Sequence, residues 1–170
     1  MSFARQKQEI IYWAGVLNQK GLVTARNGNI SCKVGEEKIL ITAHGAYLGR
    51  LQEQEILLAD VAGNILEGDA TLTSEKNLHL DIQRRFKEAR VVFHAHPTYT
   101  TAFFYYFSEL DIFSFETKLY LGQVQVIPQE TPSVTNVAAV VAALENNSIV
   151  VLRNHGVVSM GKDFKEALNV

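Results

Sequence analysis

The pattern of apolar and polar residues predicts alternating helices and short strands, beginning with a helix over residues 3–20. Gly21 ends this helix, because glycine readily takes the left-handed conformation of a C-terminal cap. Trp13 is expected to anchor the helix. The apolar side chains that recur at close to helical spacing are Phe3, Ile10, Ile11, Trp13, Ala14 and Leu17.

Short runs rich in β-branched and aliphatic residues predict strands. The turn Asn27-Gly28-Asn29 leads into a first strand. Residues 55–66, EILLADVAGNIL, read as a β-hairpin with its turn near Gly63. The other predicted strands are KILIT (38–42), RVVFHAH (90–96), QVQVIP (123–128) and SIVVLRNHG (148–156), which VVSMG (157–161) continues.

A helical pattern returns at Thr73, where Leu78, Ile82 and Phe86 are spaced by four and Thr73 or Ser74 offers an N-cap oxygen. Further helices are predicted over 98–106, 133–144 and 163–170. Helices and strands alternate irregularly, with hairpins among them, which favours a mixed sheet with helices on its faces. The sequence shows no internal repeat or linker, so we expect one domain over 1–170.

Composition narrows the classes of function. Sixteen basic and eighteen acidic residues give a net charge of -2 without any Lys/Arg cluster, so neither nucleic acid nor a membrane surface is an expected partner. No apolar stretch approaches the roughly 20 residues needed to span a bilayer. Cys32 is the single cysteine, which excludes an intramolecular disulfide and a thiolate metal cage and favours a small buried residue in a strand. We expect a soluble cytoplasmic protein.

Three histidines predict a metal site. His94 and His96 are two apart on a predicted strand, which places both imidazoles on one face, and His155 lies at the end of another strand. A His-x-His pair on a strand also arises without a metal, but the third histidine favours one. Three imidazoles with an open position are typical of catalytic zinc, although other divalent transition metals also accept imidazole.

Glu75 is the candidate general acid or base, because it precedes the His-x-His strand in the first turn of a helix. The alternative is a carboxylate that only stabilises the helix N-terminus. His79, one turn later, either orients Glu75 or faces the core, and we favour the structural role.

Two turns and the start of one helix could together bind an anion. Asn27-Gly28-Asn29 and His44-Gly45 can present backbone N–H groups, and Thr73 and Ser74 can donate from the start of a helix. Most such turns only reverse the chain, but together they predict a site for phosphate or carboxylate.

In this order, the motifs resemble the class II aldolase/adducin family, which includes fuculose-phosphate aldolase, ribulose-phosphate 4-epimerase and methylthioribulose-phosphate dehydratase. The matching segments are GLVTARNGNIS (21–31), ILITAHG (39–45), TSEKNLH (73–79), VVFHAHPTYTTA (91–102) and VVLRNHGVVSMG (150–161).

The resemblance implies an α/β/α sandwich with a central, mostly antiparallel sheet, assembled as a homotetramer with active sites at subunit interfaces. It implies that Glu75 is the acid/base of an aldol cleavage of a phosphorylated ketose, in which zinc stabilises the enediolate. The implied metal ligands are His94, His96 and His155. The implied phosphate ligands are Gly28, Asn29, Gly45, Thr73 and Ser74, to which we add His44.

The chain also departs from the family pattern. His44 stands where relatives often carry a small hydroxyl donor, and Arg26 adds a further candidate phosphate contact. Family members continue with a long helix and a tail that supplies a catalytic tyrosine in the aldolases, and we expect this chain to lack that tail. Glu116 aligns with the catalytic glutamate of the dehydratases or is a solvated surface carboxylate.

We therefore expect a zinc-dependent lyase, with aldol cleavage ahead of dehydration. A 4-epimerase is a weaker alternative, because its equivalent of Glu75 is usually aspartate. A non-catalytic adducin-like interaction module is the alternative outside enzymes, and loss of the metal histidines would mark it.

Overall fold

The computed structural model describes residues 3–112, 114–121 and 123–170. Its strands form one eight-stranded sheet in the order β4-β3-β2-β1-β5-β8-β7-β6. Of the pairings formed by the described residues, β6 with β7 is parallel and the others are antiparallel, which confirms the mostly antiparallel sheet. The strands are β1 (Asn29–Lys33), β2 (Lys38–Thr42), β3 (Ile56–Asp60), β4 (Ile65–Glu67), β5 (Val91–Ala95), β6 (Gln125–Pro128), β7 (Ile149–Arg153) and β8 (Gly156–Gly161).

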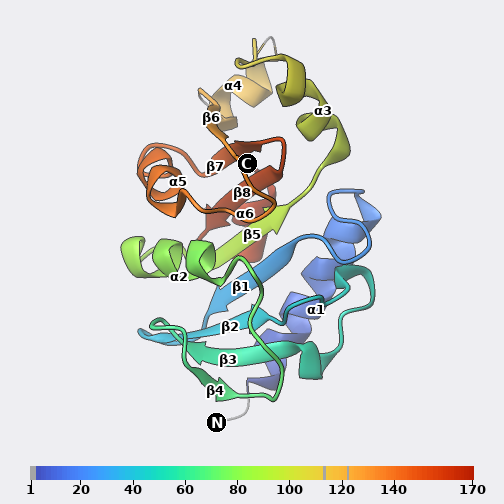
Figure 1. The fold of residues 1–170 in the computed structure, drawn as a ribbon, viewed down its shortest axis with the longest axis vertical. Helices are drawn as coiled ribbons and strands as arrows, with labels where there is room; N and C mark the ends of the chain where they lie inside the picture. Colours follow the sequence, from blue (N-terminus) through green and yellow to red (C-terminus); the bar gives the residue numbers. More distant parts are fainter. Residues whose placement is uncertain (1–2, 113, 122) are drawn as a thin grey trace.

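Helices cover both faces of this sheet, which confirms the α/β/α sandwich (Figure 1). Alternation along β1 and β5 turns Ile30 and Phe93 toward α1 and α6, and Val92 toward α2 and α5. Helices α3 and α4 extend beyond the sheet at the top of Figure 1. The helices are α1 (Ala4–Gln19), α2 (Lys76–Arg85), α3 (Thr98–Tyr106), α4 (Phe115–Leu121), α5 (Val137–Ala143) and α6 (Phe164–Leu168), with short 3₁₀ turns at Leu48–Arg50 and Glu53–Glu55.

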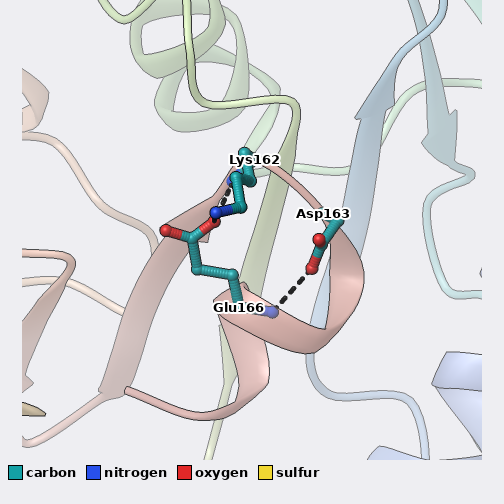
Figure 2. A network of polar contacts seen from close by, with 3 residues as sticks. All are labelled: Lys162, Asp163 and Glu166. Carbon is teal, nitrogen blue, oxygen red and sulfur yellow. Dashed lines mark hydrogen bonds and ion pairs between the residues drawn. The ribbon is translucent and has the colours of Figure 1, made fainter.

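The last helix is short but firmly attached. Asp163 caps α6 by accepting a hydrogen bond from the Glu166 N–H (2.8 Å), and Glu166 accepts one from the Lys162 N–H (3.1 Å), as Figure 2 shows. Phe164 at the start of α6 stacks on Trp13 of α1, with ring centroids 6.1 Å apart. Trp13 thus anchors the first helix, as predicted. None of the helices among the described residues is long and apolar enough to cross a membrane.

Three predicted boundaries were wrong. Residues 148–161 form two antiparallel strands, because the chain turns at Asn154 (φ 64°) and pairs Leu152 with Gly156. The segment Arg153-Asn154-His155-Gly156, which separates the two apolar runs, forms this turn. Helix α2 begins at Lys76, and its N-cap is Glu75 in place of the predicted Thr73 or Ser74. The Lys76 N–H bonds the Thr73 carbonyl, so residues 73–76 form a turn before the helix. Helix α5 is also shorter than the predicted 133–144.

Gly156 allows β8 to approach the end of β5. A Cβ atom at this position would lie 2.2 Å from the backbone oxygen of Ala95, so no side chain fits without moving the strand. We predict that Gly156→Ala lowers the free energy of unfolding by about 2–4 kcal/mol. Gly15→Ala is the matched control, because a Cβ there meets nothing within 4 Å in α1 and should stabilise by about 0.5–1 kcal/mol. Urea unfolding measures both, and equal midpoints for the two variants would contradict the predicted contact.

Candidate metal centre

The three histidines predicted to bind metal come together at one end of the sheet. His94 lies in β5, His96 follows that strand, and His155 occupies the turn between β7 and β8. Because β5 pairs with β8, with Ala95 opposite Val157, the segments that follow β5 and precede β8, which carry His96 and His155, lie side by side. Among the described residues, these three form the group of side chains able to share one ion: their ligand atoms all lie within 4.8 Å of one another.

Hydrogen bonding sets the tautomer of His94. Its Nδ1 lies 3.0 Å from the backbone oxygen of Val157, which can only accept, so Nδ1 carries the proton and Nε2 presents a lone pair. That Nε2 lies 2.9 Å from Nε2 of His96 and 3.0 Å from Nε2 of His155. A metal-binding histidine typically has this backbone partner on its other nitrogen.

The charge state of the cluster also suits a cation. Burial lowers the pKa of His94 well below the ordinary value, and the neighbouring His96 and His155 lower it further. Burial likewise lowers the pKa of His96 to about 4 and shifts the pKa of His155 in the same direction. All three rings are therefore neutral near pH 7, which is the form that binds a metal.

The donor set fits one divalent ion. Nitrogen ligands about 2.0–2.1 Å from a tetrahedral zinc ion lie about 3.3 Å apart, close to the spacing of these nitrogens. Without an ion, the single lone pair of His94 Nε2 faces two other ring nitrogens and can satisfy only one N–H donor. Convergence of three Nε2 atoms is thus better explained by a shared cation than by hydrogen bonds.

Glu75 lies outside this group. It is buried at the start of α2, and its Oε2 accepts a hydrogen bond from the Val134 N–H (3.0 Å). Burial raises the pKa of the carboxyl, against the opposing effects of hydrogen bonds from Val134 and Ser133. The structure therefore holds Glu75 as a readily protonated acid oriented by the segment before α5, and it does not make Glu75 a fourth ligand.

The predicted anion-binding segments are neighbours. Ala43 forms an isolated β-bridge with Leu72, and the His44 N–H bonds the Thr71 carbonyl (2.9 Å), so residues 43–44 lie against 71–72, directly before Thr73 and Ser74. A Cβ atom at Gly45 would lie 3.9 Å from a guanidinium nitrogen of Arg26. Arg26 directly precedes the turn Asn27-Gly28-Asn29, so this turn is also near Gly45.

Within these segments the candidates differ in what they can offer. Gly28 and Gly45 both take positive φ angles, 79° and 71°, that other residues rarely adopt. The side chains of His44 and Ser74 are exposed. Thr73 is buried, and its hydroxyl accepts from the Glu75 N–H (3.3 Å). The His44 N–H is already used by Thr71, so the exposed imidazole is the part of His44 available to a ligand.

Asn29 connects the anion-binding segments to the metal centre. It pairs directly with His94 across β1 and β5, and a Cβ at the preceding Gly28 would lie 2.9 Å from the His94 carbonyl oxygen. The Asn29 side-chain oxygen lies 2.6 Å from Nε2 of His79. His79 is fully buried, and its other bond goes to Ser31 and not to the Glu75 carboxyl, so its predicted structural role is confirmed.

Comparison with known proteins identifies the family of this chain. Residues 8–170 match the profile of the family described as the class II aldolase and adducin N-terminal domain. The chain belongs to the class II aldolase and adducin family. An L-fuculose phosphate aldolase of Methanococcus maripaludis is 34% identical over 152 residues, which cover 89% of this chain and 82% of that protein.

Other members of the class II aldolase and adducin family match over almost the whole chain. A 3-oxo-tetronate 4-phosphate decarboxylase of Haemophilus influenzae is 28% identical over 98% of this chain and 82% of its own length. The crystal structure of L-fuculose-1-phosphate aldolase from Thermus thermophilus superposes with a TM-score of 0.84, at 30% identity, covering 98% of this chain and 85% of that one. The relatives are named enzymes of the same fold, which confirms the predicted family, fold and enzyme class.

The class II aldolase fold also places residues at the site that sequence reasoning missed. A cavity of about 660 Å³ opens beside His96 and His155, and its other lining residues are Thr98, Thr101, Ala102, Tyr105, Tyr106 and Asn154. Both tyrosines are exposed. Asn154 could have been found from its place beside His155 in the turn. Glu116 lies in α4, but its side chain is outside the described residues, so its role stays a prediction.

Proposed function

We propose that this chain is a metal-dependent lyase that breaks a carbon–carbon bond of a small phosphorylated ketose by aldol cleavage. The observation that carries the proposal is the convergence of three neutral imidazole nitrogens, 2.9–3.0 Å apart about His94, beside an open cavity. The similarity to an L-fuculose phosphate aldolase supports this reaction class. We propose zinc as the metal, because three imidazoles and an open position are typical of its catalytic sites.

His94, His96 and His155 would hold the ion. When bound, it supplies a Lewis acid that polarises the substrate carbonyl and stabilises negative charge on the oxygen. Glu75 would carry the proton at the reacting carbon: its raised pKa means that it keeps its proton to a higher pH than an exposed glutamate and is a stronger base when ionised, and the Val134 N–H fixes the direction of its carboxyl group.

The substrate phosphate would lie among the three neighbouring segments that carry Gly28, His44 and Thr73. Positive-φ glycines let the backbone approach an anion closely, and Arg26 supplies a positive charge next to Gly45. The proposed phosphate ligands are Gly28, Asn29, His44, Gly45, Thr73 and Ser74.

Decarboxylation of a phosphorylated 3-oxo acid is the second candidate, favoured by the 3-oxo-tetronate 4-phosphate decarboxylase that matches 98% of this chain. Loss of carbon dioxide and loss of an aldehyde both leave an electron pair on the carbon beside a ketone, so the same residues serve either reaction. The two differ in the fragment that leaves.

We propose that the chain acts in the cytoplasm as a homotetramer with active sites at subunit interfaces. Helices α3 and α4 support assembly, because they expose large aromatic side chains: Tyr99 is 91% exposed and Phe115 is 87% exposed. An exposed apolar surface of this kind is typical of an interface with another protein chain. Sedimentation equilibrium measures the assembly directly.

A product assay tests the reaction. Zinc-loaded protein is incubated with a panel of ketose 1-phosphates and phosphorylated 3-oxo acids, and NMR follows the products. The proposal expects one equivalent of aldehyde for each equivalent of dihydroxyacetone phosphate, whereas bicarbonate without aldehyde would establish the decarboxylase. No turnover of either class by protein that holds its metal would favour the adducin-like alternative.

A further inference from the structure

A line of buried polar side chains lies between α2 and β1. Asn29 and Ser31 alternate onto the same face of β1, and His79 and Gln83 are one turn apart on α2. Ser31 and His79 are 0% exposed, Gln83 is 2% exposed and Asn29 is 7% exposed. The Gln83 side-chain oxygen has no partner among the described residues, whereas its amide nitrogen and the polar groups of Ser31 and His79 are hydrogen-bonded, so the direction of each of these bonds can be worked out.

The direction of the hydrogen bonds is fixed at the Gln83 end. The Gln83 amide nitrogen lies 3.3 Å from the Arg90 backbone oxygen, which can only accept. The same nitrogen lies 3.2 Å from the Ser31 hydroxyl oxygen and therefore donates to it as well. Among the described residues the other partner of that hydroxyl is Nδ1 of His79, at 2.8 Å, so the single Ser31 proton is donated there.

The direction continues through His79. Because its Nδ1 accepts from Ser31, the one proton of the neutral ring is on Nε2 and is donated to the Asn29 side-chain oxygen, 2.6 Å away. Burial supports the neutral form, since it lowers the pKa of His79 to about 3. The chain of bonds thus runs from Gln83 through Ser31 and His79, and ends on the oxygen of the Asn29 amide.

The amide nitrogen of Asn29 is left facing away from His79. It has no hydrogen-bond partner among the described residues. It is also absent from the buried polar atoms that lack a partner, so this nitrogen reaches the solvent-accessible surface. This surface lies beside the metal centre, because Asn29 is opposite His94 and follows the Gly28 turn. An asparagine amide that rotates by half a turn exchanges these N–H donors for an acceptor of the same shape.

We propose that Gln83, Ser31 and His79 are positioning residues that act through Asn29, holding its amide N–H groups as donors toward an anionic oxygen of the ligand. The reverse orientation would present a carbonyl oxygen to the anion and repel it. The chain of bonds excludes that orientation, because it would leave the His79 Nε2–H without an acceptor. The identity of the ligand as a sugar phosphate rests on the proposed function, but the orientation does not.

Inorganic phosphate is the probe, titrated by calorimetry into the full-length protein. Ser31→Ala removes the hydroxyl in the middle of the chain and should raise the dissociation constant about fivefold to tenfold, because one donor to a charged group is no longer fixed. Ser159→Ala is the matched control: it removes another buried serine hydroxyl, bonded to the Ala167 carbonyl (2.6 Å), and should leave phosphate affinity unchanged. Asn29→Asp should weaken binding further, since an acceptor replaces the donors.

A second measurement needs no variant. Two-bond ¹H–¹⁵N correlation spectra report the tautomer of each histidine, and we expect His79 to carry its proton on Nε2. A proton on Nδ1, no phosphate binding by the wild type, or equal phosphate affinity in Ser31→Ala and Ser159→Ala would each overturn the proposal. Neither readout requires turnover, so failure of the lyase proposal shows separately in the product assay.

Discussion

Replacing Glu75 with glutamine lowers kcat by about 10²–10⁴-fold and leaves the metal content unchanged. General acid–base catalysis typically contributes a factor of this size, and glutamine keeps the shape of the side chain while losing the proton. The Val134 N–H that now donates to Oε2 can still bond an amide oxygen, so the fold is retained. Metal content is unaffected, because Glu75 is not in the group of ligand atoms around His94.

Exchange of the α-proton of dihydroxyacetone phosphate with deuterated water isolates this step from carbon–carbon bond cleavage. Glu75 must be ionised to remove the proton, and burial raises its pKa above the ordinary value of 4.5. The exchange rate should therefore fall as the pH decreases through that raised pKa, and this pH dependence should be lost in Glu75→Gln. Glu36→Gln, in the exposed turn between β1 and β2, is the control. Unchanged exchange in Glu75→Gln would show that another group moves the proton.

The three histidines that come together could be found from the sequence, because strand alternation and a glycine at the end of a strand are local signals. His94 and His96 had to share a face, and Gly156 had to allow close approach beside His155. The order of the motifs then supplied the family and the sandwich fold. The same signals extended one strand over 148–161, whereas Asn154 and His155 form a turn between two antiparallel strands, which the segment Arg153-Asn154-His155-Gly156 marks in the sequence.

Contacts between distant segments could not be found in this way. The isolated bridge between Ala43 and Leu72, which brings the anion-binding turns together, has no local signature. Nor does the bond from Val134 to Glu75, which links residues 59 positions apart. His79 was expected to be structural from its helical position, but its partner Asn29 depends on the packing of α2 against β1.

The aromatic residues of α3 show a second limit. The helical pattern over 98–106 does not say which of these side chains are covered, and Phe104 is buried. Tyr105 and Tyr106 instead line the cavity beside His96 and His155. Hydrophobicity alone does not distinguish a core position from a ligand-facing one, because aromatic side chains occupy both kinds of position.

Replacing His96 with alanine should abolish metal binding and, with it, turnover. The site has three protein ligands, and loss of one leaves two imidazoles, His94 and His155, to hold the ion. Removing His44, an exposed histidine outside the triad, should leave the metal in place, so His44→Ala separates ligand loss from a general effect of deleting an imidazole.

Elemental analysis of metal content in the wild type, His44→Ala and His96→Ala therefore tests the central claim most directly. The predicted result is about one zinc per chain in the wild type and in His44→Ala, and less than about 0.1 in His96→Ala. Carefully purified wild-type protein that takes up no metal, even after zinc is added back, would contradict the metal centre and with it the proposed lyase.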